Sequence, residues 1–224
     1  MPHNGSMKLA AVVLAAGGST RFGQPKQLAV FQDKTFVRRI VAAANEAGCA
    51  PIVVVVGPNA AQIASELTGL PVSIAEHPNW SNGLGSSIAV GVEHAANITA
   101  DLDAVILLTC DQPFVNAAAL RQLIQLYLEN GKPIVASAYA ETLGIPALFD
   151  RSCFAELLQL TGDSGAKRII LAQQRDVVPF DFPAAAIDID TAADYEKLCD
   201  SKDRMQKECK AKHDTSPVNE PSHL

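Results

Sequence analysis

Lys8-Leu-Ala-Ala-Val-Val-Leu-Ala-Ala-Gly17-Gly18-Ser19-Thr20-Arg21-Phe-Gly23-Gln-Pro25-Lys26 is the stretch that decides the fold of this chain. Its first half is a short apolar run, which is typical of a buried strand. The glycines that follow permit positive φ angles and let the backbone approach a ligand closely, so that its amides can hold a polyphosphate. Arg21 and Lys26 add positive charge. We therefore predict a phosphate site at the carboxyl end of a first strand, where open α/β sheets bind their ligands.

The same pattern has an ordinary structural explanation. A strand, a Gly-Gly turn and a helix form a common connection in α/β proteins. The stretch is neither Gly-x-Gly-x-x-Gly nor Gly-Lys-Ser/Thr, so it predicts neither a dinucleotide-binding fold nor a P-loop ATPase. The two cations just past the turn favour phosphate binding over a purely structural turn.

Apolar, strand-like runs alternate with helix-like stretches along the chain. This order predicts an α/β fold in which helices cover both faces of a mostly parallel sheet. We expect one domain, residues 7–199, followed by a polar, disordered tail, residues 200–224. The predicted strands are Leu9–Leu14, Ile52–Val56, Val72–Ile74, Ala104–Thr109, Pro133–Ala138 and Ala186–Ile189, and the predicted helices are Thr35–Ala47, Asn59–Leu67, Ser86–Ala96, Asn116–Asn130, Cys153–Gln159, Ala166–Ala172 and Thr191–Leu198.

Composition excludes several classes of protein. The chain has 224 residues, 48% of them hydrophobic, and a formal net charge of −6, so it has no broad basic surface for nucleic acid. No apolar run approaches the roughly 20 residues that cross a membrane, and residues 1–6 do not resemble a signal peptide. The five cysteines form no CxxC pair. We expect reduced thiols and a cytoplasmic protein.

Carboxylates follow two of the predicted strands. Asp111 comes just past the strand that begins at Ala104, where it points toward the ligand crevice and can hold Mg²⁺ beside a polyphosphate. Its alternative role is to cap the next helix, but Asn116 suits that role better. Asp188 and Asp190 alternate along the last short strand, so they point to one face, where two like charges are unfavourable unless they share a cation or solvent reaches them. Asp190 or Thr191 can also cap the helix that follows.

Two further loops combine glycines with polar side chains. Residues 79–87 are rich in glycine and serine and precede a helix, so they can read a base or ribose. Residues 160–168 end in two cations at the head of a helix, so they can bind a second anionic substrate. Each loop can equally be an ordinary capped helix start.

Several motifs together resemble the MobA-like nucleotidyltransferases. In chain order they are Leu14 to Lys26, Gly83-Leu-Gly-Ser-Ser87, Cys110-Asp-Gln-Pro113, Gly144-Ile-Pro-Ala-Leu-Phe149, Gly162-Asp-x-Gly-Ala166 and Asp188-Ile-Asp-Thr-x-x-Asp-Tyr195. The chain looks most like the molybdenum cofactor cytidylyltransferase branch. The resemblance implies a three-layer α/β/α sandwich of the nucleotide-diphospho-sugar transferase type, and Mg²⁺ as cofactor.

The resemblance also implies roles for residues at the matching positions. Leu-Ala-Ala-Gly in the turn, together with the Gly-Ser-Ser loop, implies CTP rather than GTP. The acceptor loop departs from the family pattern, because Lys167-Arg168 follows Ala166 where the family commonly has Ala-Arg, which leaves open which cation acts. The implied residues are Arg21, Lys26 and Asp111 for catalysis; Leu14, Ala15, Ala16, Gly17, Gly18, Ser19, Arg21, Lys26, Gly83, Ser86 and Ser87 for the nucleotide; Asp163, Gly165, Lys167 and Arg168 for the acceptor; and Asp111 and Asp190 for the metal.

The expected reaction is transfer of CMP from CTP to the phosphate of molybdenum-bound molybdopterin, with release of pyrophosphate. Its expected partners are CTP, a phosphorylated pterin-type acceptor, and a molybdoenzyme or its chaperone, with the chain itself a monomer. Two alternatives remain open. One is nucleotidyl transfer to another small phosphate, such as a sugar phosphate or phospholactate. The other is a non-catalytic nucleotide-binding cofactor chaperone.

Overall fold

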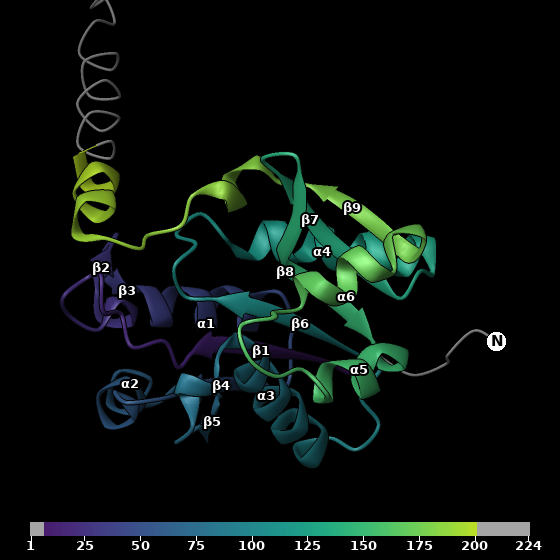
Figure 1. Cartoon of the computed structure of the whole chain (residues 1–224), viewed down its shortest axis with the longest axis horizontal. Coiled ribbons are helices and arrows are strands. Elements are labelled where there is room, and N and C mark those ends of the chain that lie inside the picture. The colour runs from purple at the N-terminus through teal and green to yellow at the C-terminus, as the bar shows by residue number, and fades with distance from the viewer. Residues whose placement is uncertain (1–6, 201–224) are drawn as a thin grey trace, which may run out of the picture.

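The apolar run at the start of the chain forms β1, an interior strand of the larger sheet (Figure 1). A computed structural model describes residues 7–200. Its strands are β1 (Leu9–Ala15), β2 (Val30–Phe31), β3 (Lys34–Thr35), β4 (Ile52–Val56), β5 (Ser73–Glu76), β6 (Ala104–Thr109), β7 (Ile134–Tyr139), β8 (Thr142–Asp150) and β9 (Val177–Asp181). Its α-helices are α1 (Phe36–Glu46), α2 (Ala60–Glu66), α3 (Leu84–Ile98), α4 (Ala117–Asn130), α5 (Phe154–Leu158) and α6 (Lys167–Ala172), with a last helix over residues 192–200.

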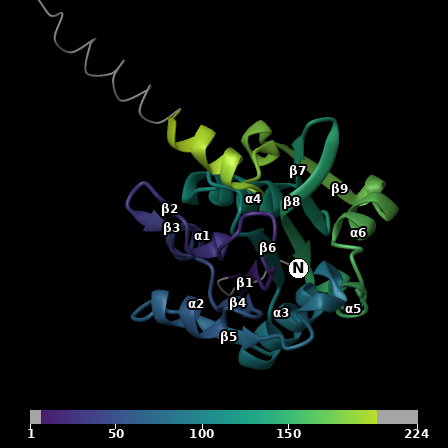
Figure 2. The ribbon, with the colours of Figure 1, turned by 60° about the vertical axis from the view of Figure 1, so that its left-hand side comes forward.

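Seven strands form the main sheet in the order β5-β4-β1-β6-β8-β7-β9. Every neighbouring pair is parallel except those of β8, which runs antiparallel to both β6 and β7. The strands β2 and β3 form a separate small hairpin on the same side of the molecule as the helix over residues 192–200 (Figure 2). The hydroxyl of Tyr195 in this helix donates to the carbonyl of Val30. The predicted α/β fold with a mostly parallel sheet is confirmed.

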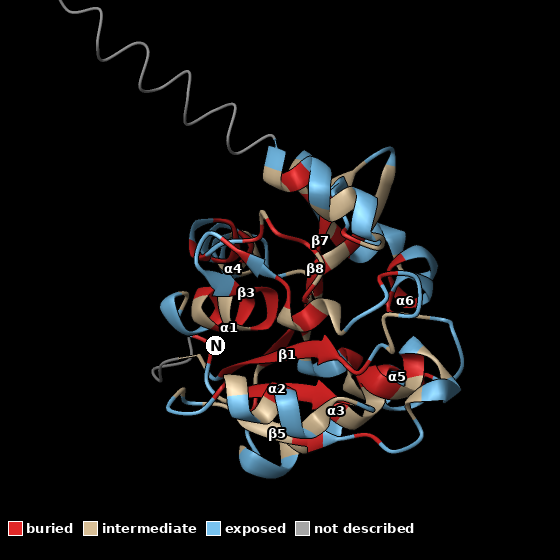
Figure 3. Cartoon of the chain, turned by 90° about the vertical axis from the view of Figure 1, so that its left-hand side faces the viewer, coloured by how far each residue is buried: buried red, intermediate tan, exposed pale blue. Residues whose placement is uncertain are grey.

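Two hydrophobic clusters, one on each face of the sheet, bury β1 completely (Figure 3). Successive side chains of a strand point to opposite faces, so Leu9, Ala11 and Val13 join the first cluster while Ala10 and Val12 join the second. The first cluster includes residues of α1 and α4, and the second includes residues of α3, α5 and α6. The run of apolar residues without alternating polar ones is therefore explained by burial on both faces.

The parallel pairing of β4, β1 and β6 brings three carboxyl ends to one edge of the sheet. The turn at residues 17–26 follows β1, Gly57 follows β4, and Asp111 lies two residues past β6. This edge is where the sequence predicted the ligand crevice.

Four strands were not predicted from the sequence, and one predicted strand is wrong. The missed strands are the two-residue strands β2 and β3 and, in the main sheet, β8 and β9. The strand β8 lacks the fully apolar pattern of a central parallel strand. Residues 186–189 form no strand. A short 3-10 helix, η5 (Pro183–Ala186), occupies its start, and Ile189 makes a single backbone hydrogen bond to the carbonyl of Asp111 instead of pairing with a strand. The helix that follows is capped by Thr191, whose hydroxyl accepts from the amide of Asp194.

The expectations about the cysteines, the tail and membrane-spanning segments can be compared with the structure only within the described residues. The four described cysteines, Cys49, Cys110, Cys153 and Cys199, are free, as predicted, whereas Cys209 lies outside the described residues. The predicted tail also lies outside them, except for residue 200. Within residues 7–200, no helix has both the length and the apolar character needed to span a bilayer.

We predict that Gly91→Ala destabilises the protein. A Cβ at position 91 of α3 would overlap Val12 Cγ1 and come within 2.8 Å of Val55 Cγ2. Overpacking of this kind costs about 1–3 kcal/mol, which outweighs the gain of about 1 kcal/mol that alanine brings to a helix. Urea unfolding of both proteins measures the difference. Glu93→Ala, on the exposed side of the same helix, is the control. Stabilisation by Gly91→Ala would contradict the packing of α3 against β1 and β4.

Candidate active site

The turn after β1 is held in shape by one buried glutamine. The side-chain amide of Gln27 donates to the carbonyls of Ala15, at 3.0 Å, and Gly17, at 2.8 Å, and only 2% of this residue is exposed. Ser19 has a φ of 52°, in the left-handed region, and its hydroxyl accepts from the amide of Lys26 and donates to Gln27. Hydrogen bonds within the turn therefore hold a conformation that costs a non-glycine residue free energy.

The backbone amides of residues 17 to 21 donate to no atom within residues 7–200. Farther along the turn, the amides of Phe22 and Gly23 do donate, both to the carbonyl of Ser19. A run of neighbouring amides without protein acceptors, on residues that solvent reaches, is a typical anion-binding arrangement. This part of the turn can therefore hold phosphate oxygens.

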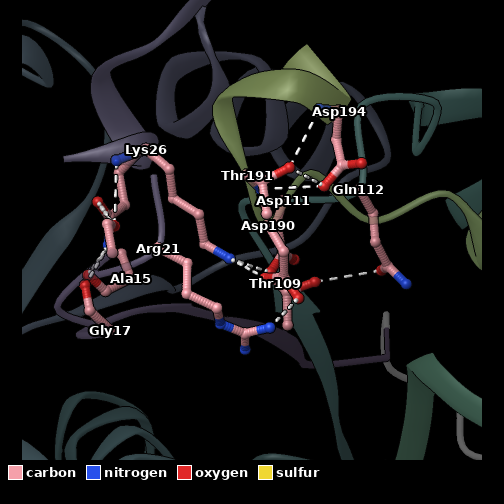
Figure 4. Close-up of polar contacts among 12 residues, drawn as sticks. Ala15, Gly17, Arg21, Lys26, Thr109, Asp111, Gln112, Asp190, Thr191 and Asp194 are labelled. Atoms are coloured by element: carbon pink, nitrogen blue, oxygen red, sulfur yellow. Dashed lines mark hydrogen bonds and ion pairs between the residues drawn. The ribbon is translucent and has the colours of Figure 1, made fainter. Parts of the chain in front are cut away.

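A lysine joins the two carboxylates that the sequence predicted as metal ligands (Figure 4). The ammonium of Lys26 donates to Asp111 Oδ2 at 2.8 Å and to Asp190 Oδ1 at 3.0 Å. The guanidinium of Arg21 lies 3.7 Å from Asp190 Oδ2, with 75% of the arginine side chain exposed. Burial lowers the pKa of Lys26, but the attraction of Asp111 and then Asp190 outweighs it, so the pKa lies above its ordinary value. The structure thus brings these four predicted residues together.

Backbone and side-chain contacts fix the positions of the carboxylates. The amide of Ile189 donates to the carbonyl of Asp111 at 2.9 Å, which brings Asp190 beside the end of β6. The buried amide of Gln112 donates to the carbonyls of Ile145 and Ala185. The loop after β6 is therefore tied both to β8 and to the segment that carries Asp190.

The site holds more negative than positive charge. Asp111 and Asp190 pair with the cations Lys26 and Arg21, and Asp188 is near enough to interact with the charges of Asp111, Asp190 and Lys26. Asp188 keeps a solvent-exposed edge, yet the protein packed around it raises its pKa, and the nearby charges of Asp111 and Asp190 add to the effect, giving about 6. Three carboxylates against two cations leave an excess of one negative charge at neutral pH. A triphosphate beside them needs further positive charge.

A cleft of about 320 Å³ lies between this cluster and the loop before α3. Eight of the predicted site residues line this cleft: Leu14, Ala16, Gly17, Lys26, Gly83, Ser87, Asp111 and Asp163. Ala15, Gly18, Ser19, Arg21, Ser86, Gly165, Lys167, Arg168 and Asp190 do not line it. Six residues to which the sequence gave no individual role complete the lining, three of them in the loop of residues 79–87 that was predicted to read a base or ribose: Gln27, Trp80, Ser81, Leu84, Thr109 and Cys110.

Trp80 explains two of the glycines beside the cleft. A Cβ at Gly18 would lie 2.8 Å from the indole ring, and one at Gly57 would lie 3.0 Å from it and 2.5 Å from the carbonyl of Ala16. Gly18 has no positive φ, so packing against Trp80 accounts for it. The only tryptophan of the chain therefore lies against the turn after β1. Its isolated position in a polar loop gave no periodic pattern from which this contact could be predicted.

The two serines that were predicted to bind the nucleotide, Ser86 and Ser87, lie in different environments. Ser87 is buried and lines the cleft. The hydroxyl of Ser86 donates to the carbonyl of Gly83 and lies 2.9 Å from the Nε2 atom of His77. His77, to which the sequence analysis gave no role, is buried beside the start of α3. Ser86 and His77 thus fix the loop, whereas Ser87 faces the space that a nucleotide can enter.

The two glycine-rich loops predicted to bind different substrates lie against each other. The amide of Gly85 donates to the carbonyl of Gly162, and a Cβ at Gly83, whose φ is 97°, would overlap the backbone of Gly162. Gly165 is covered by Leu84. Asp163 consequently reaches the cleft, while Lys167 and Arg168 are exposed at the first turn of α6 and do not line it.

Comparisons with known proteins agree with this geometry. Residues 11–177 match the family described as "MobA-like NTP transferase domain". The chain is similar to the crystal structure of Rv0371c from Mycobacterium tuberculosis H37Rv, with 30% identity, a TM-score of 0.72, and coverage of 87% of this chain and 98% of that one. A second structure of Rv0371c, 29% identical with a TM-score of 0.69 and coverage of 87% and 100%, is a complex with manganese.

Curated relatives carry different activities in their names. Nicotine blue oxidoreductase from Paenarthrobacter nicotinovorans is 26% identical over 84% of this chain and 94% of its own length. A probable molybdenum cofactor guanylyltransferase from Bacillus cereus is 36% identical, but the match covers 57% of this chain and 61% of that protein. The chain therefore spans less than two thirds of the second relative. These two names describe different activities, so they do not indicate one shared acceptor substrate.

We predict that Gln27→Met loosens the turn after β1. Methionine keeps the length of the side chain but removes the amide that donates to Ala15 and Gly17, so two carbonyls beside the cleft lose a donor. The expected loss of stability is about 1–3 kcal/mol, measured by thermal and urea unfolding. Gln125→Met, at an exposed position of α4, is the matched control and should stay within about 0.5 kcal/mol of the wild type. Equal stability of all three proteins would refute the structural role of Gln27.

Proposed function

The chain belongs to the family of MobA-like NTP transferases, and on this basis we propose that it transfers CMP from CTP to the phosphate of molybdenum-bound molybdopterin. The observation that carries the proposal is the meeting of two features at one cleft. The amides of residues 17 to 21 lack protein acceptors, and Lys26, Asp111 and Asp190 form a charged cluster beside them. Such a site binds a triphosphate at one end and handles the charge at its reacting phosphorus at the other.

The proposed reaction is a displacement at the α-phosphorus of CTP. An oxygen of the acceptor phosphate forms a new P–O bond, and the bond between the α-phosphorus and its bridging oxygen breaks as pyrophosphate leaves. The attacking oxygen is already anionic, so no strong general base is needed. This agrees with the contact of His77, which lies against Ser86 rather than in the cleft lining. The work of the site is to bring two anions together and to stabilise the leaving group.

The two aspartates fit a magnesium ion. Asp111 and Asp190 both direct a carboxylate oxygen at the same cation, the ammonium of Lys26, which stands in for a metal. Mg²⁺ is held by one or two carboxylates together with phosphate oxygens and water. When bound, Mg²⁺ would offset the charge of the phosphates and of the leaving group.

The chain's own residues have separate proposed tasks. The turn amides hold the phosphate oxygens in a fixed orientation, and Arg21, mostly exposed, neutralises charge on the solvent side. Lys26 supplies positive charge on the phosphates. Ser87 and Leu14 line the wall of the cleft where the nucleoside fits.

CTP is preferred over GTP in this proposal because the Leu-Ala-Ala-Gly turn and the Gly-Ser-Ser loop resemble those of the cytidylyltransferase branch. Ala16 of the turn and Ser87 of the loop both line the cleft. The guanylyltransferase name of one relative makes nucleotide choice the first point to test.

The acceptor part of the proposal concerns Asp163, Gly165, Lys167 and Arg168. Asp163 reaches the cleft, and the exposed cations at the start of α6 can attract a phosphorylated acceptor. The test is pyrophosphate release from each of the four NTPs with Mg²⁺ and the molybdenum-bound pterin, or a sugar phosphate or phospholactate in its place. Release with the pterin supports the proposal. Release only with another phosphate favours that acceptor, and no release favours a binding protein.

We predict that Asp111→Ala lowers the rate of pyrophosphate release by about a hundredfold or more, because the site loses a metal ligand and a partner of Lys26. Steady-state release with saturating CTP measures the effect. The control is Asp101→Ala, which removes an aspartate whose side chain is 79% exposed. Asp101 precedes β6, whereas Asp111 follows the carboxyl end of that strand, so the control should leave the rate unchanged. Unchanged turnover in Asp111→Ala would remove Asp111 from the reaction.

We also predict that CTP raises the melting temperature more than GTP does at equal concentration, because the ligand with the lower dissociation constant stabilises the folded state more, by RT ln(1 + [L]/Kd). Trp80 lies at the cleft, so its fluorescence should change in the same titrations and give both dissociation constants. ATP and UTP complete the comparison. Equal shifts, or a larger shift with GTP, would reject CTP as the substrate.

A further inference from the structure

We infer that the Lys26 ammonium and a divalent cation exclude each other from the position between Asp111 and Asp190. The cation then binds well only when a nucleotide draws the ammonium away. This inference deepens the proposed function and rests on it for the identity of the nucleotide. The competition itself is a property of three side chains of this protein.

The geometry leaves no room for both cations. Lys26 contacts Asp111 at 2.8 Å and Asp190 at 3.0 Å, which are direct charge-assisted hydrogen bonds. Magnesium binds carboxylate oxygens at about 2.0–2.1 Å, so an ion bound by both aspartates would lie where the ammonium lies. The lysine and Asp111 side chains are only 16% and 21% exposed. Both partners of this contact are therefore largely shielded from solvent.

The protein alone offers few ligands to a metal. Within residues 7–200, no group of three or more histidine, cysteine, aspartate or glutamate side chains is placed to hold a metal ion. The two converging carboxylates are already partly neutralised by Lys26. A small, strongly hydrated cation therefore gains little by leaving water for this site. Oxygens from the nucleotide's phosphates would supply the ligands that the protein lacks.

A bound triphosphate also gives the ammonium a new partner. Lys26 follows the turn whose amides at residues 17 to 21 lack protein acceptors, so phosphate held there lies on the same chain segment as the lysine. Its long, flexible stem lets the ammonium move from carboxylate to phosphate. The nucleotide thus adds metal ligands and removes a competing cation. By thermodynamic linkage, each of the two ligands strengthens binding of the other by the same factor.

Binding of Mn²⁺ in the absence of nucleotide tests the competition. Electron paramagnetic resonance of free Mn²⁺ gives the dissociation constant for the wild type and for Lys26→Met. We expect the variant to bind Mn²⁺ about tenfold more tightly or better, because a unit positive charge a few ångströms from the metal has been removed. An unchanged or weaker affinity in Lys26→Met overturns the inference.

Three further variants locate the effect. Lys26→Gln, with a different uncharged side chain, should reproduce the gain if Lys26→Met does not fold, as judged by circular dichroism. Asp111→Asn combined with Lys26→Met should lose the gain; if the gain persists, the metal lies elsewhere and the inference fails. Lys34→Met, in β3, removes the same charge at an exposed position and should leave the affinity unchanged. A gain of equal size there would show a general charge effect and would also overturn the inference.

The outcome is separable from that of the proposed function. The Mn²⁺ titrations contain neither nucleotide nor acceptor, so they stand whether or not the protein releases pyrophosphate. Tighter Mn²⁺ binding by Lys26→Met without any turnover by the wild type would support the competition and reject the transferase. Turnover by the wild type, together with equal Mn²⁺ affinities of the wild type and Lys26→Met, would support the transferase and reject the competition.

Discussion

The ammonium of Lys26 holds together three parts of the chain that are far apart in sequence. Asp111 lies 85 residues from it and Asp190 lies 164 residues from it, yet both accept a hydrogen bond from the same nitrogen. Two carboxylates this close repel each other, and burial strengthens that repulsion. A cation between them offsets this repulsion where the turn after β1, the loop after β6 and the segment before the last helix converge. The charge arrangement at this edge of the sheet depends on this contact.

The same contact explains why the site suits a charged ligand. A cation held by two carboxylates can be exchanged for another cation or drawn toward another anion, because its partners stay in place. The surrounding charges, three carboxylates against two basic residues, leave an excess of negative charge that a nucleotide alone would worsen. A divalent ion would offset part of this charge. The chemistry proposed for this protein therefore follows from its electrostatics as much as from its family.

Close packing of small residues shapes the space around that charged cluster. Gly83 and Gly85 let the loop before α3 lie against the loop at Gly162, and Gly18 and Gly57 make room for Trp80. Packing thus accounts for Gly18, which the sequence predicted as a phosphate contact, and for Gly83, which was predicted to bind the nucleotide. Glycines whose amides face solvent, Gly17 above all, keep the capacity to hold an anion.

The sequence by itself determined what depends on neighbours along the chain. Burial of β1 followed from its unbroken apolar run, the turn followed from its glycines and cations, and the position of Asp111 at the end of β6 followed from the alternation of strands and helices. Only the tertiary structure decided which distant groups meet. The convergence of Asp190 on Lys26, the contact of Trp80 with Gly18, the turning of Ser86 toward His77 and the antiparallel course of β8 all depend on pairings across many residues. Local periodicity does not indicate such pairings, because they depend on the packing of whole elements and on charges that come close together only when the sheet has formed.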